Sequence, residues 1–583
     1  MQYSGSRILI ESLIEQGVDT VFGYPGGAVL FIYDELYRQR DRIRHILVSH
    51  EQHAAHAADG YARSTGKVGV CLATSGPGAT NLITGIATAG MDSVPLVAIT
   101  GNVATGLLGK DSFQEVDIAG ISMPVVKHNW IVKKVDELAE VIREAFIVAQ
   151  SGRPGPVLID IPKDISALTA EWAPGKKPGK KKNIPADDVL SARAKRLTLR
   201  NERPTYTDTD IDKAVKMLSE AKRPILYAGG GVIIAGAGDE LTNLAERLHA
   251  PVALSLMGIG AIPGDHKLCT GLIGMHGTVA SNKAVQKTDL LVAIGARFSD
   301  RVTSRADMFA RTAKVLHLDI DAAEINKNIE TTAWVVGDVK ETLKKILDKL
   351  PAKIETEWNG EIEKWKTHAP KTYTVAEEAA GIKKNVLHPR FVIEETAKKL
   401  GKDTIAVTDV GQHQIWTAQF FPAHRPRSFL SSGGLGTMGF GLGAAEGAKV
   451  ANPKRPVALF TGDGCFRMNC AEMGTLKTYG IPVLIVVFNN STLGMVRQWQ
   501  NFFYEGRYSE TDLPGHPDFV KLADAYGLSG YRATDRESFL KALNLASADL
   551  AAGKAALIDA KIDKDEKVFP MVPTGKPIDE QIL

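Results

Sequence analysis

The sequence predicts an α/β protein built from parallel sheets and divided into several domains. Short apolar runs typical of buried strands alternate with helix-like stretches such as 135–149 and 538–551. This alternation is typical of parallel sheets whose strands are joined by crossover helices. The chain has 583 residues, more than one hydrophobic core normally holds, so about three or four domains are expected. The predicted strands lie at 68–73, 95–100, 157–161, 225–228, 290–294, 314–320, 404–407, 457–460, 481–488 and 556–560.

Two breaks in composition divide the chain into three predicted domains. Residues 171–205 are rich in proline and lysine and poor in apolar residues, which is the composition of a linker. Its basic run could bind a polyanion, but a solvated linker is the commoner outcome. Residues 346–387 are charged and are predicted to form a helical surface connector. The predicted domains are therefore 1–170, 206–345 and 388–583, and the first and last could share a topology.

Bulk composition disfavours several classes of function. The formal net charge is only +3, which gives no reason to expect nucleic acid or an anionic membrane as a partner. No apolar run is long enough to span a membrane, and the first residues lack the apolar core and cleavage site of a signal peptide. The four cysteines are scattered and form no Cys-x-x-Cys pair, so buried reduced thiols in a cytoplasmic protein are expected.

The strongest local signal is a pair of polar clusters that each end an apolar run. Gly462-Asp463-Gly464 follows the predicted strand 457–460, and Asn489-Asn490 follows the predicted strand 481–488. The 24 residues between the clusters have room for one crossover helix, so the unit is predicted to be βαβ. Both strand ends then meet at the sheet edge where ligands bind. A carboxylate and a carboxamide are hard oxygen ligands, of the kind that Mg²⁺ takes together with water and phosphate oxygens.

Gly-rich turns and one acid mark the edge of the first predicted sheet. The turns at 23–28 and 74–81 follow apolar runs, and glycine there lets the backbone approach a ligand closely. Plain strand-to-helix loops are an equally good interpretation of either turn alone. Glu51 follows a predicted strand and begins an Ala-rich helix, where an acid usually pairs with the helix dipole. His53 and His56 lack a clear third ligand, so a zinc site is not expected.

The ordered set of motifs resembles the catalytic subunits of acetohydroxyacid synthases, also called acetolactate synthases, which are thiamine diphosphate enzymes. The resemblance covers nearly the whole chain outside the linker, and so many motifs in order are far more specific than any one. It implies three doubly wound parallel-sheet domains: pyrimidine-binding, central FAD-binding and diphosphate-binding. The motifs are GYPGGAV, HEQHAAHAADGYAR, TSGPGATN, DSFQE, SGRPGPVLIDIPKD, LIGMHG, ARFSDR, HLDIDAAEI, VGQHQIW, SSGGLGTMGFG, TGDG, NNSTLGMVRQW and PMVPTGKP.

The resemblance implies thiamine diphosphate, Mg²⁺ and FAD as cofactors. Glu51 would hydrogen-bond N1′ of the aminopyrimidine ring and so favour the tautomer that removes the proton from C2 of the thiazolium ring. Asp463, Asn490 and the main-chain carbonyl of Thr492 would hold Mg²⁺ on the diphosphate. Met438 would bend the coenzyme so that its two rings meet. The other residues implied for thiamine diphosphate are Gly26, Gly27, Gln412, Gly462, Gly464 and Met495.

The same resemblance implies sites for substrate and flavin. Gln114, Lys163 and Trp499 would act with Glu51 in catalysis, and Trp499 would shape the pocket of the second substrate. FAD would be structural or vestigial, because the reaction has no net redox step. The residues implied for FAD are Arg153, Gly229, Gly230, Met275, His276, Gly277, Arg297, Arg301, Asp319 and Asp321.

The implied reaction is acetolactate synthesis in branched-chain amino acid biosynthesis. Pyruvate is decarboxylated on thiamine diphosphate, and the hydroxyethyl carbanion is ligated to a second 2-oxo acid. With pyruvate as the second substrate the product is 2-acetolactate, and with 2-oxobutanoate it is 2-aceto-2-hydroxybutanoate. The family also implies active sites between two subunits, hence a homodimer or homotetramer, and a small regulatory subunit.

Other thiamine enzymes and an inactive scaffold are the alternatives. Glyoxylate carboligase lacks an acid at the position of Glu51, so Glu51 disfavours it. A flavin-dependent pyruvate oxidase or a 2-oxo acid decarboxylase would be distinguished by the product formed from pyruvate alone. A scaffold without catalysis is disfavoured because Glu51, Asp463 and Asn490 are all present.

Overall fold

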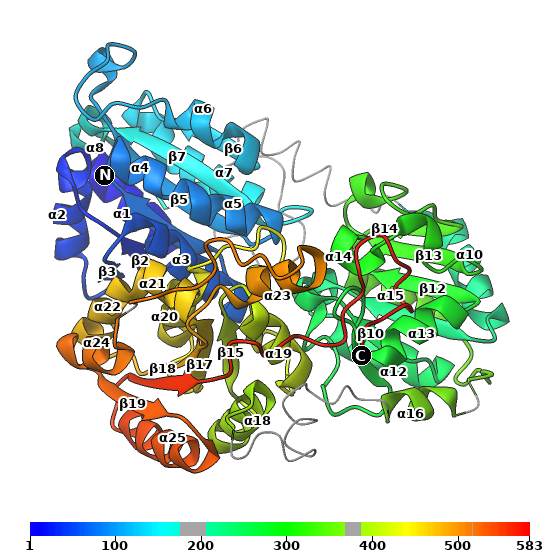
Figure 1. The fold of residues 1–583 in the computed structure, drawn as a ribbon. Coiled ribbons are helices and arrows are strands. Elements are labelled where there is room, and N and C mark those ends of the chain that lie inside the picture. The colour runs from blue at the N-terminus through cyan, green and yellow to red at the C-terminus, as the bar shows by residue number, and fades with distance from the viewer. Residues whose placement is uncertain (175–205, 359, 368–385, 516) are drawn as a thin grey trace.

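Three parallel sheets of six strands each form the framework of the protein (Figure 1). The structure is a computed structural model that describes residues 1–174, 206–358, 360–367, 386–515 and 517–583. Most of the predicted linker 171–205 and much of the predicted connector 346–387 therefore lie outside the described residues. The predicted α/β class with doubly wound parallel sheets is confirmed.

Alternating residues of the central strands explain why these sheets are covered on both faces. In the first sheet Val70 and Leu72 pack into one apolar cluster, while Cys71 packs into another. The last sheet repeats this arrangement, with Leu459 and Phe460 facing opposite clusters. Because successive side chains of a strand point to opposite faces, an unbroken apolar run needs helices on both sides.

The first and last sheets share one topology, which the sequence had indicated only as a possibility. Numbered within its own domain, each sheet has the strand order 2-1-3-4-6-5. The first sheet contains β2 (Thr20–Gly23), β3 (Arg44–Leu47), β4 (Gly69–Ala73), β5 (Leu96–Asn102), β6 (His128–Ile131) and β7 (Pro156–Pro162). The last contains β15 (Ile405–Thr408), β16 (Phe429–Leu430), β17 (Val457–Gly462), β18 (Leu484–Asn489), β19 (Ser529–Ala533) and β20 (Ala556–Lys561). A small antiparallel pair, β1 (Gln2–Ser4) and β8 (Thr169–Glu171), lies beside the first sheet.

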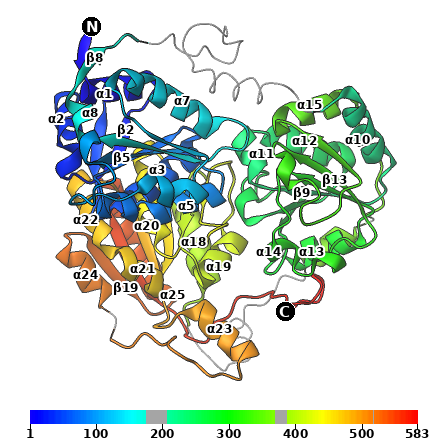
Figure 2. The same ribbon diagram turned by 90° about the horizontal axis from the view of Figure 1, so that it is seen from above.

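The central sheet has a different order, 3-2-1-4-5-6 within its own domain, which is the order of dinucleotide-binding folds. Its strands are β9 (Pro224–Ala228), β10 (Val252–Leu254), β11 (Cys269–Leu272), β12 (Leu290–Ile294), β13 (Lys314–Asp319) and β14 (Ala333–Val336). Both views place this domain to one side of the other two (Figure 1, Figure 2). The C-terminal tail runs from the last domain to it, where Val572 N donates to Met275 O at 2.8 Å.

Helices of ordinary length cover the three sheets. Among the described residues none is long and apolar enough to cross a membrane. The main helices of the first domain are α1 (Gly5–Glu15), α2 (Leu30–Arg38), α3 (Glu51–Thr65), α5 (Ile83–Met91) and α7 (Leu138–Gln150). Those of the central domain are α10 (Asp208–Glu220), α11 (Gly230–Ala235), α12 (Gly238–Leu248), α13 (Val279–Lys287), α14 (Asp300–Thr303), α15 (Val339–Lys349) and α16 (Glu361–Lys366). Those of the last domain are α18 (Pro389–Leu400), α19 (Gln412–Phe420), α20 (Phe440–Ala451), α21 (Asp463–Asn469), α22 (Met473–Tyr479), α23 (Gly494–Phe503), α24 (Phe519–Ala525) and α25 (Arg536–Ala551).

Three details differ from the sequence-based expectation. The single crossover helix expected after Gly464 is two helices, α21 and α22, because the backbone of Asn469 leaves helical geometry and a 3₁₀ turn follows. Strand β18 begins at Leu484, since Pro482 has no N–H for the sheet ladder. All four cysteines are free, but Cys269 and Cys470 are only partly buried.

Helices α3 and α20 join the first and last domains at very close range. They occupy equivalent places in the two sheets, each as the crossover between the second and third strands. A Cβ on Gly60 would lie 2.1 Å from Ala444 O, and a Cβ on Gly447 would lie 1.8 Å from Ala57 O. Only glycine at both positions lets the two backbones approach so closely.

Gly447→Ala is expected to destabilise the protein strongly, because its methyl group would overlap backbone that cannot move aside. We expect a loss of about 3 kcal/mol or more, above the usual range for overpacking. Thermal unfolding of the apoprotein measures it. Gly106→Ala is the matched control, because a Cβ there meets no atom within 4 Å. Equal melting temperatures for both variants would contradict this packing.

Candidate functional site

A cavity opens at the carboxyl edge of the last sheet, beside the point where the strand order reverses between β15 and β17. Parallel sheets bind ligands at such points. The cavity lies where α19, α21 and α23 begin and where β18 ends. Its lining is Val410, Gly411, Gln412, His413, Trp416, Met438, Gly462, Asp463, Gly464, Cys465, Phe488, Asn490, Thr492, Leu493, Gly494, Met495, Val496 and Ile562. The structure thus brings the predicted Gln412, Met438, Gly462–Gly464, Asn490, Thr492 and Met495 together.

The three predicted metal ligands lie in this cavity. Asp463 is 1% exposed, and burial raises the pKa of its carboxyl group to about 7. Backbone N–H groups of Gly464 and Ser491 oppose that shift. Asn490 and Thr492 are also buried, and Thr492 N donates to Asn490 Oδ1 at 3.2 Å. A desolvated carboxylate beside amide and carbonyl oxygens is the donor chemistry that fits Mg²⁺ with phosphate oxygens.

Polar contacts around the cavity hold Asn490 and its neighbours in place. Gln412 Oε1 lies 3.5 Å from Asn490 Nδ2, and Gln412 Nε2 donates to Gln498 Oε1 at 2.9 Å and to Glu566 O at 2.8 Å. Among the described residues no three His, Cys, Asp or Glu side chains gather as a metal cluster. A cation here would therefore be held by one carboxylate and by neutral oxygens.

Trp499 lies on α23, one turn after the cavity residue Met495. It is half-buried and packs edge to face against Phe503, with 5.3 Å between ring centroids. Residues four apart share one face of a helix, so Trp499 stands beside the cavity without lining it.

The predicted residues of the first domain gather at the carboxyl edge of its own sheet. Glu51 begins α3, and Asn81 Nδ2 donates to its Oε2 at 2.9 Å. Gln114 packs against Gly76, where a Cβ would lie 2.8 Å from Gln114 O. Lys163 is exposed and begins the short helix α8 (Lys163–Ala167) directly after β7. Gly26 lies against Thr74, while Gly27 faces open space.

Glu51 and the Asp463 cavity are separate within one chain. All lining residues of the cavity belong to the last domain, from Val410 to Ile562. Among the residues that the structure describes, no first-domain residue of the predicted site lines this cavity.

The predicted flavin residues lie at the carboxyl edge of the central sheet. Gly229 and Gly295 follow the two strands where the order reverses, and a Cβ on Gly229 would lie 2.2 Å from Gly295 O. Gly230 begins α11, and Tyr227 OH donates to Arg297 O at 3.0 Å. Such close turns at the switch point suit the pyrophosphate of a dinucleotide.

The other predicted flavin residues border the same edge. Met275 N donates to Arg301 O at 2.9 Å, and His276 Nδ1 lies 3.1 Å from Pro570 O. Burial lowers the pKa of His276 to about 4. Asp321 N donates to Asp319 Oδ1 at 2.9 Å. Arg153 Nη1 of the first domain lies 3.3 Å from Asp321 and 2.8 Å from Glu324. Gly277 directly follows His276 in the chain.

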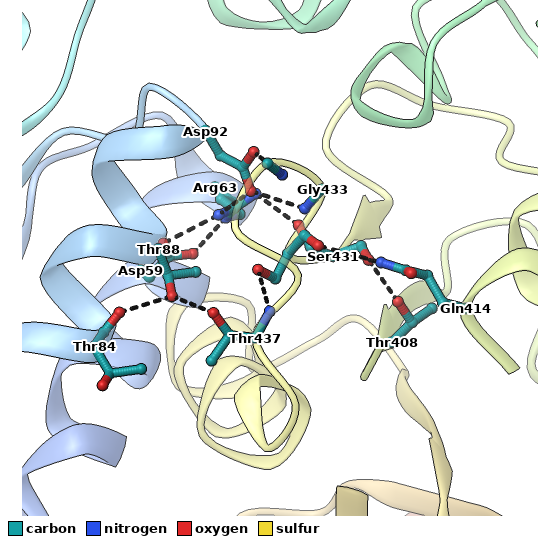
Figure 3. Close-up of polar contacts among 12 residues, drawn as sticks. Asp59, Arg63, Thr84, Thr88, Asp92, Thr408, Gln414, Ser431, Gly433 and Thr437 are labelled. Carbon is teal, nitrogen blue, oxygen red and sulfur yellow. Dashed lines mark hydrogen bonds and ion pairs between the residues drawn. The ribbon is translucent and has the colours of Figure 1, made fainter. Parts of the chain in front are cut away.

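A buried polar network that the sequence did not reveal holds the loop before Met438 (Figure 3). Arg63 of α3 pairs with Asp59 and with Asp92, at 3.0 Å from Asp92 Oδ2, and donates to Ser431 O at 2.9 Å. Asp92 accepts the N–H groups of Gly433 and Gly434 at 3.0 and 2.7 Å. The Thr88 and Thr437 hydroxyl groups lie 2.7 Å apart. First-domain side chains therefore hold the loop 431–437 in its observed conformation.

Arg63→Met is expected to destabilise the protein by about 3 to 5 kcal/mol, because it leaves two buried carboxylates without their cation. The Arg63 side chain is only 6% exposed. Arg38→Met is the matched control, since the Arg38–Asp34 pair is 65% and 60% exposed and is worth about 0 to 1 kcal/mol. Thermal unfolding of both variants measures the difference, and a similar shift for the two would refute the importance of the network.

Comparisons with known proteins agree on one family across the chain. Residues 3–121, 211–346 and 409–560 match, in order, the N-terminal TPP binding domain, the central domain and the C-terminal TPP binding domain of thiamine pyrophosphate enzymes. The acetolactate synthase large subunit of Corynebacterium glutamicum is 46% identical, over 98% of this chain and 89% of its own. That of Buchnera aphidicola subsp. Schizaphis graminum is 45% identical, over 100% and 98%. An acetolactate synthase of Mycobacterium bovis is 46% identical, over 99% and 91%.

Proposed function

The chain belongs to the acetolactate synthase large-subunit family of thiamine pyrophosphate enzymes, and from this premise we propose its reaction and the residues that carry it. The protein decarboxylates pyruvate and joins the remaining two-carbon unit to a second 2-oxo acid. Pyruvate or 2-oxobutanoate is the acceptor, so the products are 2-acetolactate or 2-aceto-2-hydroxybutanoate, precursors of branched-chain amino acids. The observation that carries the proposal is the Asp463, Asn490 and Thr492 oxygen set in a cavity at a switch point.

Asp463, Asn490 and the carbonyl of Thr492 would hold Mg²⁺, which would neutralise the diphosphate of the coenzyme. When bound, thiamine diphosphate supplies the nucleophilic carbon and the electron sink for decarboxylation. Glu51 holds a proton at N1′ of the aminopyrimidine ring, and Asn81 Nδ2 orients its carboxyl group at 2.9 Å. The apolar lining, including Trp416 and Met438, excludes water from the reacting centre. Gln114, Lys163 and Trp499 border the substrate.

The active site forms between two copies of the chain. Glu51 does not line the Asp463 cavity of its own chain, which supports a site completed by Glu51 of a second copy. We therefore expect a homodimer, or a homotetramer made of such dimers. The names of the relatives specify large subunits, which supports a small regulatory subunit as a further partner.

FAD binds at the carboxyl edge of the central sheet. The 3-2-1-4-5-6 strand order and the close turns at Gly229 and Gly295 support this assignment. Arg153 and the acids Asp319 and Asp321 border the same edge. Free cysteines support a cytoplasmic location.

The test is product analysis on the purified chain. It is incubated with pyruvate, thiamine diphosphate, Mg²⁺ and FAD, with one component left out at a time, and the product is identified by NMR. We expect 2-acetolactate that depends on the coenzyme and on Mg²⁺. Acetaldehyde, acetate or acetyl phosphate as the main product would instead identify a decarboxylase or an oxidase and would refute the proposal.

A further inference from the structure

A buried glutamate of the last domain holds the segment of the first domain that carries Glu51. Glu472 is fully buried in the 3₁₀ turn Cys470–Glu472. Both of its carboxylate oxygens accept the N–H of Ser49 at 3.1 Å, and one lies 2.6 Å from His53 Nδ1. Thr475 Oγ1 also donates to it, at 2.5 Å. One carboxylate thus contacts residues on both sides of Glu51.

Neighbours of Glu472 fix the same segment. Tyr479 OH accepts the N–H of Leu47 at 2.9 Å, and Thr475 Oγ1 lies 3.3 Å from Leu47 O. Ser49 Oγ donates to Ala471 O at 3.1 Å. Contacts from the last domain to backbone atoms of Leu47 and Ser49 therefore hold the segment 47–53, which runs from the end of β3 into the first turn of α3.

A second buried carboxyl group lies beside Glu472. Glu446 of α20 is fully buried, and burial together with the charge of Glu472 raises the pKa of Glu446 well above its usual range. The protonated form of Glu446 is therefore favoured beside Glu472. The buried Glu472 carboxylate accepts hydrogen bonds from Ser49 N and Thr475 Oγ1, and such bonds offset the cost of burying a polar group.

We propose that Glu472 is a positioning residue for Glu51: it sets where the carboxyl group of Glu51 stands relative to the aminopyrimidine ring, without touching the coenzyme itself. The inference rests on the role of Glu51 in the proposed function. The stretch 463–472 begins at the predicted metal ligand Asp463 and ends at Glu472. It therefore contains both a metal ligand and the residue that contacts the segment carrying Glu51. A catalytic group displaced by about 1 Å can lose about 100-fold in rate, so this hold is expected to matter.

The experiment compares three substitutions of the same chemical kind in the intact protein. Glu472→Gln replaces the carboxylate that contacts Ser49 and His53 with a neutral amide. Glu446→Gln is the matched control, because it makes the same chemical change at another fully buried glutamate close to Glu472. Glu51→Gln reports whether the acid itself acts as proposed. Thr475→Val keeps the shape of the side chain and removes one contact to Leu47 and one to Glu472. It is the substitute variant if Glu472→Gln folds poorly.

Three measurements distinguish a positioning role of Glu472 from a general effect of the substitution on folding. The first is the H/D exchange rate of the C2 proton of bound thiamine diphosphate, measured by NMR after rapid quenching. The second is the affinity for thiamine diphosphate with Mg²⁺, followed by tryptophan fluorescence because Trp416 lines the cavity. The third is backbone amide exchange of the apoprotein by mass spectrometry, which compares residues 47–54 with α25.

Glu472→Gln is expected to slow C2 exchange by about 10-fold to 100-fold, with coenzyme affinity within about twofold of wild type. Amide exchange should rise in residues 47–54 and stay unchanged in α25. Glu446→Gln should match wild type in all three readouts. If Glu51→Gln slows C2 exchange while Glu472→Gln and Thr475→Val exchange at the wild-type rate, the positioning role is wrong and the proposed function stands. If C2 exchange in Glu51→Gln also proceeds at the wild-type rate, the proposed role of Glu51 is wrong, and so is the positioning role of Glu472.

Discussion

Glu51→Gln should reduce turnover and C2 proton exchange by about 100-fold to 10,000-fold, the range for loss of a positioned acid or base. The amide cannot share a proton with the aminopyrimidine ring, although its shape and its contact with Asn81 are largely kept. Affinity for thiamine diphosphate in the presence of Mg²⁺ should change little, because the metal ligands lie in the other domain. Quenched-flow NMR measures the exchange, and a coenzyme titration measures the affinity.

The matched control for Glu51→Gln is Glu341→Gln, which makes the same chemical change at a side chain 64% exposed on α15. The control should behave as wild type in both assays. A Glu51→Gln protein that keeps normal C2 exchange would show that another group activates the coenzyme.

Asp463→Asn should lower the affinity for thiamine diphosphate by about 100-fold or more. Removing one charged partner from a buried site costs about 3 to 5 kcal/mol, and each 1.4 kcal/mol is a tenfold change in binding. Asp463 is 1% exposed, so water cannot easily replace its carboxylate as a partner of the cation. The coenzyme is titrated at fixed Mg²⁺, and raising the Mg²⁺ concentration should recover part of the loss.

Asp348→Asn, on the exposed face of α15, is the matched control for Asp463→Asn and should bind the coenzyme as wild type does. If Asp463→Asn binds normally, the diphosphate is anchored elsewhere and the cavity described here is not its site.

The framework of the protein could be predicted because the local signals are strong. The strand predicted at 290–294 matches β12, since five apolar residues form one buried parallel strand. Gly462, Asp463 and Asn490 could be placed together before the structure, because they follow strands that are adjacent in a parallel sheet. The topology shared by the first and last domains was predictable only as a possibility, because strand order depends on packing between distant segments.

The contacts between domains could not be predicted from local patterns. Glu472 and Ser49 are 423 residues apart, and nothing near either one indicates a partner. Arg63 and Asp92 resemble ordinary helix residues in the sequence, and their burial arises only when α3 packs against the last domain. The break between α21 and α22 also involves residues distant in the sequence, since the Asn469 side chain donates to Gly439 O within the last domain.

The central claim is that Glu51 of one chain acts on a coenzyme held by Asp463 of another. Co-expression of Glu51→Gln and Asp463→Asn chains with different tags tests it most directly, because each variant alone has no complete site. A mixed dimer has one site with both substitutions and one with neither, so random pairing should restore about a quarter of wild-type acetolactate formation. If purified mixed dimers are as inactive as their parents, the acid and the metal ligands do not meet between chains, and the account of the active site is wrong.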